Sequence, residues 1–347
     1  MQRRARLLPV SGRLVLCAFV AALAAGGCTT PPPRPVAEPV AQPEPGPVLA
    51  QDDELSIVIA AAGDSANALA QRYLGDASKG WWILETNGGT EIRPGQVVVI
   101  PRKSRNPIGV YADGYQTIPI LCYHRFGTKV SKLTVTPAAF AAQMQFLAKN
   151  GYHVLPLSRV GEFLSGRMPL PKKSVVITID DGYRSTFEIA WPILKQHGFP
   201  ATVFLYSDFV GAGDALNWGQ MKEMTASGLV EIQPHSKTHA NLTLRLADET
   251  ETRYRERVRR EVDTPIGLIK ERLSLPSASF AYPYGDVNEI VVDLLARQGT
   301  QLGVTVTPGG NGFFAYPYML RRNMVFGNED LEAFKAKLNV FVRTAGR

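Results

Sequence analysis

The sequence has few cysteines, few histidines and little excess charge. Three cysteines and five histidines occur among 347 residues. The formal net charge is +7, but four of the positive charges lie in the first 27 residues, which contain no acid, so only +3 remains without them. A charge this small does not favour nucleic-acid binding. The chain is 45% hydrophobic and 20% charged, a balance that allows one large domain and a small one.

The N-terminus has the organisation of an export signal. An arginine-rich start precedes an apolar run over residues 14–25, which is too short to span a bilayer comfortably. We therefore expect residues 1–27 to be a signal peptide. Residues 25–28, Ala-Gly-Gly-Cys, resemble the lipobox of bacterial lipoproteins, although alanine stands where that family prefers leucine.

The lipobox resemblance implies that Cys28 is acylated and becomes the new N-terminus. Thr29 carries no inner-membrane retention signal, which favours an outer-membrane protein facing the periplasm; simple secretion is the alternative. Cys17 would leave with the signal, so Cys122 would stand alone and no structural disulfide is expected. Cys122 lies in an apolar stretch and is interpreted as a small buried hydrophobic residue.

Proline dominates the segment that follows the cysteine. Residues 31–47 contain eight prolines with Glu, Ala and Gln between them. This composition cannot bury a core and favours an extended, semi-rigid chain. We expect residues 28–54 to be a linker that holds a folded body away from the membrane.

Residues 55–102 have the pattern of a small strand–helix–helix–strand unit. Gly63-Asp64-Ser65 marks a turn and a helix N-cap, and Pro94-Gly95 marks a later turn. The segment resembles a LysM domain, the module that binds N-acetylglucosamine-containing glycans. The matching positions are Gly63, Asp64, Leu69, Ala70, Tyr73, Trp82, Ile83, Asn87, Ile92, Pro94, Gly95, Gln96, Val99, Ile100 and Pro101. Ser65-Ala66-Asn67 departs from the usual Thr-Leu, so a degenerate module kept as a spacer is the alternative.

From residue 116 onward, strand-like and helix-like runs alternate. The strand-like runs cover residues 118–123, 175–179, 201–206, 229–232, 279–282 and 303–306. Residues 248–272 are rich in Arg and Glu and predict one or two exposed helices. Regular βα alternation favours an α/β fold with parallel strands covered by helices, as an open sheet or a barrel.

Three polar features follow predicted strands, where α/β proteins place their active sites. Asp180 and Asp181 precede a glycine turn, so one carboxylate can bind a metal while the other stays free as a base. His235 and His239 lie four residues apart and can converge on a divalent ion. Residues 280–285, Phe-Ala-Tyr-Pro-Tyr-Gly, form a rigid turn that can present a backbone N–H to an oxyanion. Each feature alone also has a structural explanation.

Together and in this order, the three features resemble the polysaccharide deacetylase family with the NodB homology domain (carbohydrate esterase family 4). Residues 119–126 also resemble the opening strand of the branch that contains poly-N-acetylglucosamine deacetylases. The resemblance implies a distorted (β/α) barrel over residues 116–345. It further implies that Asp181, His235 and His239 bind a divalent metal, zinc first, with cobalt, nickel or manganese as alternatives. Asp180 would be the general base, and the N–H of Tyr284 would stabilise the oxyanion.

Two positions depart from the family pattern. Ala281 stands where the family has an arginine that orients the catalytic aspartate, and we hypothesise that Arg322 supplies this positive partner. The family's late histidine, its general acid, has no counterpart because no histidine follows His239. His124 ends the first strand, which in a closed barrel neighbours the last, and is the candidate for the acid; a packed structural histidine is the alternative.

These expectations combine into a monomeric, tethered N-deacetylase. Its substrate would be a cell-envelope polysaccharide containing N-acetylglucosamine, with peptidoglycan first because of the LysM-like module. An exopolysaccharide of the poly-N-acetylglucosamine type is the alternative substrate. A non-catalytic glycan-binding lipoprotein and a two-His-one-carboxylate iron oxygenase are alternatives of other classes.

Overall fold

The computed structural model describes residues 45–89, 91–104 and 106–344. The expected signal peptide, the expected lipid attachment site at Cys28 and most of the expected linker lie outside these ranges. Within the described ranges, no helix combines the length and the apolar character needed to cross a bilayer.

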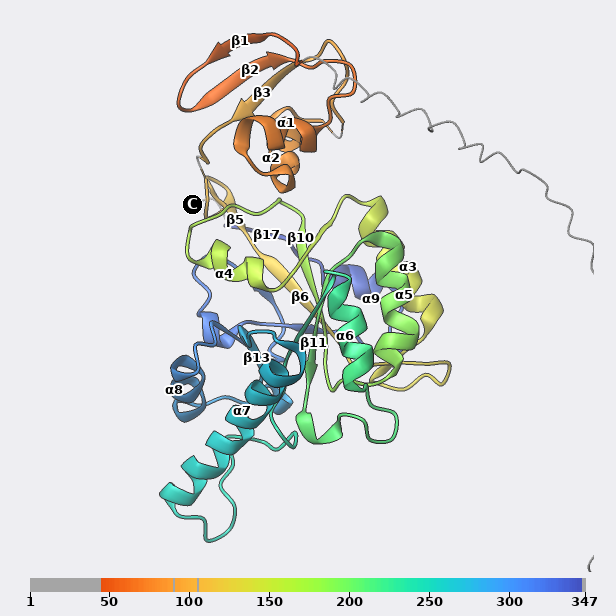
Figure 1. Cartoon of the computed structure of the whole chain (residues 1–347), viewed down its shortest axis with the longest axis vertical. Helices are drawn as coiled ribbons and strands as arrows, with labels where there is room; N and C mark the ends of the chain where they lie inside the picture. The colour runs from red at the N-terminus through yellow and green to blue at the C-terminus, as the bar shows by residue number, and fades with distance from the viewer. Residues whose placement is uncertain (1–44, 90, 105, 345–347) are drawn as a thin grey trace, which may run out of the picture. The chain divides into compact units, whose positions relative to one another are not determined.

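The small N-terminal unit is a three-stranded antiparallel sheet with two helices, in the strand order β1-β2-β3 (Figure 1). Its elements are β1 (Val48–Gln51), β2 (Leu55–Ile59), α1 (Ala66–Leu74), η1 (Ala77–Lys79), α2 (Gly80–Thr86) and β3 (Val97–Pro101). Ser65 caps α1, as expected, by accepting a hydrogen bond from the Ala68 N–H. The order β2-α1-α2-β3 matches the sequence prediction. The additional strand β1 lies in residues expected to belong to the linker.

The larger unit is built on parallel strands. Its main sheet runs β12-β11-β10-β6, with β16 beside β6 and β9 beside β10, all in parallel register. The bounds are β6 (Ile118–Tyr123), β9 (His153–Leu155), β10 (Ser174–Ile179), β11 (Ala201–Leu205), β12 (Val230–Pro234), β13 (Ser279–Ala281), β14 (Leu302–Val304) and β16 (Asn323–Met324). These strands match the runs expected from the sequence to within a few residues, apart from the short β9 and β16.

The strands close into a distorted barrel with one open seam. A parallel bridge between Val304 and Leu320 links β14 to the segment before β16, and β14 pairs with β13. Among the described residues, no backbone ladder joins β13 to β12. The side chain of Gln233 spans this seam, accepting the Ser279 N–H at 3.0 Å and donating to the Pro276 carbonyl at 3.2 Å. The seam explains why the barrel is distorted.

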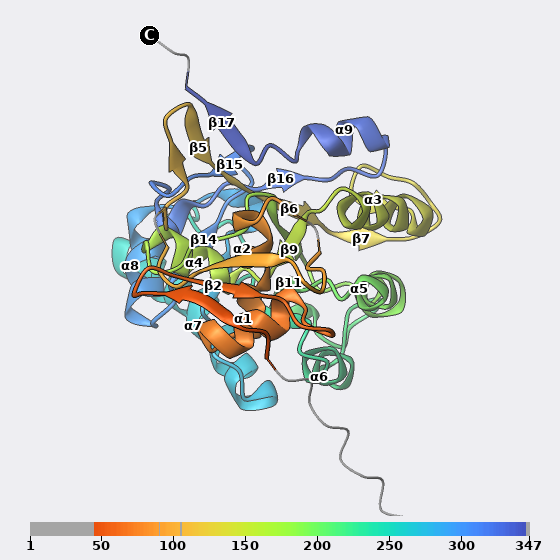
Figure 2. The same ribbon diagram turned by 90° about the horizontal axis from the view of Figure 1, so that it is seen from above.

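Helices surround the barrel strands, as Figure 2 shows for α3, α5, α6, α7 and α8. Their bounds are α3 (Pro137–Lys149), α4 (Ser158–Leu164), α5 (Trp191–His197), α6 (Trp218–Ala226), α7 (Glu251–Leu273), α8 (Glu289–Arg297) and α9 (Leu331–Ala336). A π-helical turn, η2 (Thr186–Ala190), leads into α5. The Arg- and Glu-rich segment forms the single long helix α7. Short pieces complete the unit: β4 (Val110–Tyr111), β5 (Gly114–Gln116), β7 (Arg125–Phe126), β8 (Thr134–Val135), η3 (Ser207–Phe209), η4 (Pro283–Gly285), β15 (Gly310–Asn311), η5 (Pro317–Met319) and β17 (Phe341–Arg343).

Side-chain alternation along the strands divides the core into two layers. Ile177 and Ile179 of β10 pack toward the helices in one cluster of buried side chains. Val176 belongs to a second cluster that includes Phe204 and Ala281 from other barrel strands. Successive strand residues point to opposite faces, so Thr178 shares the inner face with Val176. The residue after the strand, Asp180, continues that face into the barrel mouth.

Candidate metal centre and active site

Most of the polar residues picked out in the sequence follow parallel strands, whereas Arg322 directly precedes β16. His124 follows β6, Asp180 follows β10, His235 follows β12, and η4 with Tyr284 lies just beyond β13. Parallel strands bring their carboxyl ends to the same end of a barrel, where α/β enzymes build their sites. The fold thus collects residues up to about 160 positions apart in the chain.

Backbone conformation sends the two adjacent aspartates in different directions. Asp180 still donates its N–H to the Tyr123 carbonyl of the neighbouring strand and points inward to Arg322, whereas Asp181 has a φ of 72°, in the left-handed region. Gly182 follows with a φ of 77°, and a Cβ there would lie 3.0 Å from the Leu205 Cβ. Glycine adopts this conformation without a steric penalty. The turn therefore gives each carboxylate its own surroundings, as the sequence analysis expected.

Asp181, His235 and His239 bring three metal-ligating atoms together. The Asp181 Oδ1 lies 3.5 Å from the His239 Nε2 and 3.8 Å from the His235 Nε2. One potential ligand atom from each of the three residues lies within 4.8 Å of the others. A carboxylate with two imidazoles suits a divalent transition metal that keeps positions open for water or substrate. These three residues therefore fit the metal that the sequence predicted.

Hydrogen bonds prepare both histidines for this role. The His235 Nδ1 lies 2.7 Å from the Ala281 carbonyl oxygen, so the ring donates there and leaves the Nε2 lone pair facing Asp181. Burial lowers the pKa of His235 to about 4 and also lowers the pKa of His239. Both imidazoles are therefore neutral near pH 7, the form that binds metals.

Arg322 forms a buried, two-pronged ion pair with Asp180. Its Nη1 lies 2.7 Å from the Asp180 Oδ1 and its Nη2 lies 2.7 Å from Oδ2. The guanidinium also donates to the Thr178 Oγ1 at 3.1 Å and to the Thr305 carbonyl at 2.8 Å, and the arginine is fully buried. The geometry hypothesised from the missing arginine at position 281 is present.

The two aspartates differ in electrostatics as well as in direction. Burial alone would raise the pKa of Asp180, but the Arg322 guanidinium, with smaller contributions from His235 and His124, outweighs burial and holds that pKa well below its usual range. Burial raises the pKa of Asp181 to about 6. A divalent cation would offset this burial effect and keep Asp181 ionised. Asp180 is therefore an oriented anion that needs no metal to stay charged.

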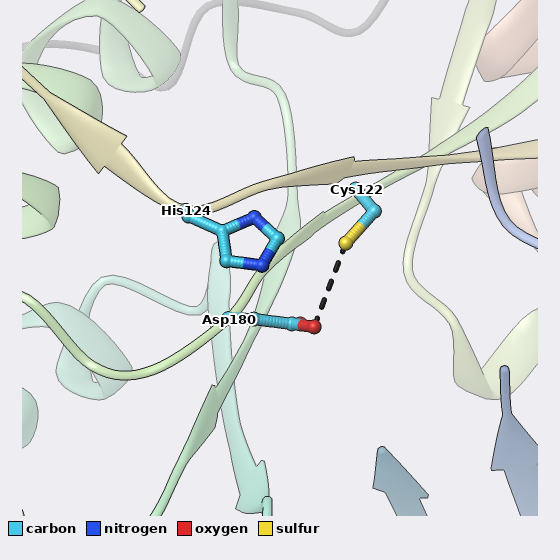
Figure 3. Close-up of side chains that lie close together, drawn as sticks. All are labelled: Cys122, His124 and Asp180. Carbon is cyan, nitrogen blue, oxygen red and sulfur yellow. Dashed lines mark hydrogen bonds between the residues drawn. The ribbon is translucent and has the colours of Figure 1, made fainter. Parts of the chain in front are cut away.

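Cys122 and His124 border Asp180 on its other side. Figure 3 shows the imidazole of His124 and the thiol of Cys122 next to each other on the same side of Asp180, and the thiol donates to the Asp180 Oδ2 at 3.5 Å. Cys122 is buried and free, as expected. Burial raises the pKa of its thiol, so it stays protonated. The Nδ1 of His124 is buried without a hydrogen-bond partner in the described part of the chain.

Tyr284 and aromatic neighbours surround His239. Tyr284 has a φ of 62° and a largely exposed ring, whose centroid lies 4.9 Å from that of His239. The Tyr206 ring lies 5.4 Å from His239 on another side and stacks on Phe209. These rings lie beside His239, which is the most exposed of the three potential ligands.

Three supporting residues were missed by the sequence analysis. Thr178 and Thr305 anchor Arg322, and Glu261 of α7 contacts the loop between His235 and His239. Thr178 shares a face with Asp180 by strand alternation, which could have identified it. Thr305 binds Arg322 through its backbone carbonyl. Every residue has such a carbonyl, so the sequence could not identify this position.

Known proteins resemble this chain over the larger unit. The family model described as "Polysaccharide deacetylase" matches residues 167–303. YxkH of Bacillus subtilis (strain 168), a provisionally named polysaccharide deacetylase, is 30% identical over 219 residues, covering 63% of this chain and 75% of its own length. The poly-beta-1,6-N-acetyl-D-glucosamine N-deacetylase of Escherichia coli (strain K12) is 28% identical over 51% of this chain, which spans only 31% of that relative.

Solved structures give the same relationship. The deacetylase PplD of Streptococcus pyogenes, in complex with acetate, superposes with a TM-score of 0.59 at 26% identity, covering 64% of this chain and 98% of its own. IcaB from Ammonifex degensii superposes with a TM-score of 0.56 at 28% identity, covering 61% and 93%. The fold, the site geometry and these similarities agree. The chain therefore belongs to the polysaccharide deacetylase family of hydrolases.

Proposed function

We propose that the chain is a tethered, metal-dependent N-deacetylase that removes acetyl groups from N-acetylated sugars of a cell-envelope polysaccharide. One observation carries the proposal. Three metal-ligating side chains, Asp181, His235 and His239, face one point, and an ionised carboxylate, Asp180, lies beside it without being one of them. Hydrolysis of an acetamide needs both a Lewis acid and a base.

Asp181, His235 and His239 would hold the ion, with zinc as the expected metal and cobalt, nickel or manganese as alternatives. When bound, a divalent ion acidifies water and polarises the acetamide carbonyl. Asp180 takes the proton from the attacking water. Arg322 keeps Asp180 ionised and fixes its direction, but the same ion pair lowers its basicity. Proton transfer to Asp180 therefore depends on a water that is already acidified.

Two further groups complete the reaction. His124 donates a proton to the leaving amine, a role supported by its place at the carboxyl end of β6 beside Asp180. The backbone N–H of Tyr284 donates to the developing oxyanion, supported by the turn of η4 next to His239. Preorganised donors of this kind are among the strongest contributors to acyl-transfer catalysis.

Peptidoglycan is the first proposed substrate because the small unit resembles a LysM domain, whose ligands contain N-acetylglucosamine. A poly-β-1,6-N-acetylglucosamine exopolysaccharide is the second candidate. It is favoured by the name of the relative from Escherichia coli. Both polymers present the same acetamide group to the site.

We further propose that a lipid on Cys28 anchors the protein to the outer membrane, on the periplasmic side. The proline-rich segment would hold the two folded units away from that surface, and the protein would act as a monomer. Supports for this arrangement are the lipobox-like residues 25–28 and the eight prolines that follow. Anchoring raises the effective concentration of the enzyme near its polymer.

Acetate release tests the proposal directly. The soluble part of the chain is incubated with peptidoglycan and with poly-N-acetylglucosamine, with and without a chelator. Acetate released only without the chelator supports a metal-dependent deacetylase, and the preferred polymer identifies the substrate. No acetate from either polymer would favour a non-catalytic glycan-binding protein. A requirement for oxygen would indicate an iron oxygenase instead.

A further inference from the structure

The loop between the two metal-ligating histidines has an unfavourable backbone conformation. Ser236 has a φ of 71° and His239 a φ of 62°, and neither is glycine. Left-handed conformations cost residues with a Cβ roughly 1–2 kcal/mol each. Within the loop, the Ser236 Oγ accepts the His239 N–H at 2.9 Å. Contacts from outside the loop must supply the rest of its stabilisation.

The carboxylate of Glu261 supplies three such contacts from α7. Its Oε2 accepts the N–H groups of Lys237 at 3.1 Å and of Thr238 at 2.9 Å. Its Oε1 accepts the Thr238 hydroxyl at 2.8 Å. Both residues between Ser236 and His239 are therefore bound to a single side chain, which is itself only 6% exposed.

The helix that carries Glu261 is firmly packed. On the same face of α7, apolar side chains pack into the buried cluster that includes Phe280 and Tyr282; these are Tyr254, Val258 and Val262. Glu261 is the charged member of this buried stripe. Among the described residues, no Lys or Arg forms an ion pair with it, and the ammonium of Lys237 pairs with Asp208 instead. A buried carboxylate is costly unless its hydrogen bonds are satisfied, so its occurrence here indicates a function for these three bonds.

We propose that Glu261 is a positioning residue that holds the His235–His239 loop in the conformation needed to bind the divalent ion. This inference rests on the metal site in the proposed function. Glu261 does not touch the ion or the substrate. It fixes the loop before the ion arrives, so that binding does not have to order the two imidazoles. Losing it weakens metal binding more than it changes the reaction of the loaded enzyme.

Metal affinity of the purified soluble protein tests the inference, with Co²⁺ as the probe and competition against a chelator as the readout. Removing groups that orient metal ligands typically costs about 10–100-fold in affinity. We expect that loss for Glu261→Ala, together with a changed Co²⁺ absorption spectrum. Glu261→Gln retains most of the affinity, because its carbonyl can accept both N–H groups while its amide donates to the Thr238 hydroxyl.

Glu249→Ala is the matched control. Glu249 also accepts a loop N–H, from Leu246, and binds Arg257 of α7, but it does not touch the His235–His239 loop. The control should bind Co²⁺ like the wild type. Wild-type affinity in a folded Glu261→Ala variant, or an equal loss in Glu249→Ala, would overturn the inference.

A second variant covers the case in which Glu261→Ala does not fold. Thr238→Val removes one hydrogen bond to the carboxylate and should weaken Co²⁺ binding about fivefold; unchanged affinity would overturn the inference.

The Co²⁺ affinity also separates this inference from the proposed function. Wild-type protein that binds Co²⁺ but releases no acetate contradicts only the proposed deacetylase activity. Wild-type protein that releases acetate while Glu261→Ala binds Co²⁺ normally contradicts only the role of Glu261.

Discussion

At the scale of single residues, the site depends on two neighbouring carboxylates with different partners. Asp180 is bound by Arg322 on both oxygens, whereas Asp181 faces two neutral imidazoles. Asp180 is therefore always paired with a positive charge, whereas Asp181 has no positive partner in direct contact until a cation binds. This difference separates the roles of base and ligand, although the two residues are adjacent in the chain.

Arg322→Met tests the first of these partnerships. The variant leaves the buried Asp180 carboxylate without its cation, which should lower stability by about 3–5 kcal/mol. It also loses the group that orients Asp180, so turnover should fall about a hundredfold or more. Metal affinity should change far less, because Arg322 contacts none of the three ligands. Equal losses of turnover and metal affinity, measured by acetate release and by metal titration, would count against this role.

His124→Gln tests the proposed proton donor. Losing a general acid should reduce kcat about 10²–10⁴-fold, while metal affinity stays near that of the wild type. His153→Gln is the control, because His153 starts β9 and belongs to no candidate site. Near-normal acetate release by the His124 variant would show that the amine receives its proton from another group.

Metal binding should weaken in acid. Burial raises the pKa of Asp181 to about 6, so in the metal-free protein a proton competes with the ion for this carboxylate below that pH. His235 has a pKa of about 4 and stays neutral at pH 5. Zinc affinity should therefore fall about tenfold between pH 7 and pH 5. Calorimetric titration of the metal-free protein at the two pH values measures this, and equal affinities would contradict it.

The residues of the metal centre could be predicted from the sequence, because aspartates and histidines stand at suitable spacings just after predicted strands. Asp180, Asp181, His235 and His239 stand beside recognisable strand or turn signals, and the missing arginine at position 281 directed attention to Arg322. Glu261 gave no such signal. Its partners are backbone N–H groups more than 20 residues away, and it lies in a helix rich in charged residues.

At the scale of elements, alternating strands and helices were predictable from apolar periodicity and capping residues. Thr136 with Pro137 starts α3, and Gly198 with a φ of 63° ends α5; these residue types favour helix starts and helix ends, respectively. Strand β1 was not expected, because all four of its side chains are exposed and show no alternation. The open seam between β12 and β13 could not be predicted either, since it depends on how the strands twist in three dimensions.

Gln233→Leu tests the seam. The substitution keeps a similar volume but removes the bonds to the Ser279 N–H and the Pro276 carbonyl. Leaving the buried Ser279 N–H unpaired costs about 1–3 kcal/mol, so the free energy of unfolding in urea should fall by at least about 1 kcal/mol. Gln301→Leu, at an exposed glutamine just before β14, is the control and should change stability little. A Gln233 variant as stable as this control would show that the seam needs no side-chain bridge.

At the scale of the whole molecule, we propose that the small unit recognises the glycan and that the large unit carries out the chemistry. Deleting residues 45–101 should raise KM for a long polymer, because the extra binding contact is lost. The kcat on a short N-acetylglucosamine oligomer should stay the same. An unchanged kcat also shows that the shortened protein is folded. Unchanged KM on the polymer would indicate that the small unit is a spacer.

The central claim is that one ion held by Asp181, His235 and His239 drives deacetylation. Its most direct test is acetate release from N-acetylglucosamine oligomers by protein that has been stripped of metal and then titrated with zinc. We predict no release from the stripped protein and full recovery at one ion per chain. Replacing His235 and His239 together by alanine should abolish the recovery. Acetate release that persists in the stripped protein, or in this double variant, would contradict the account.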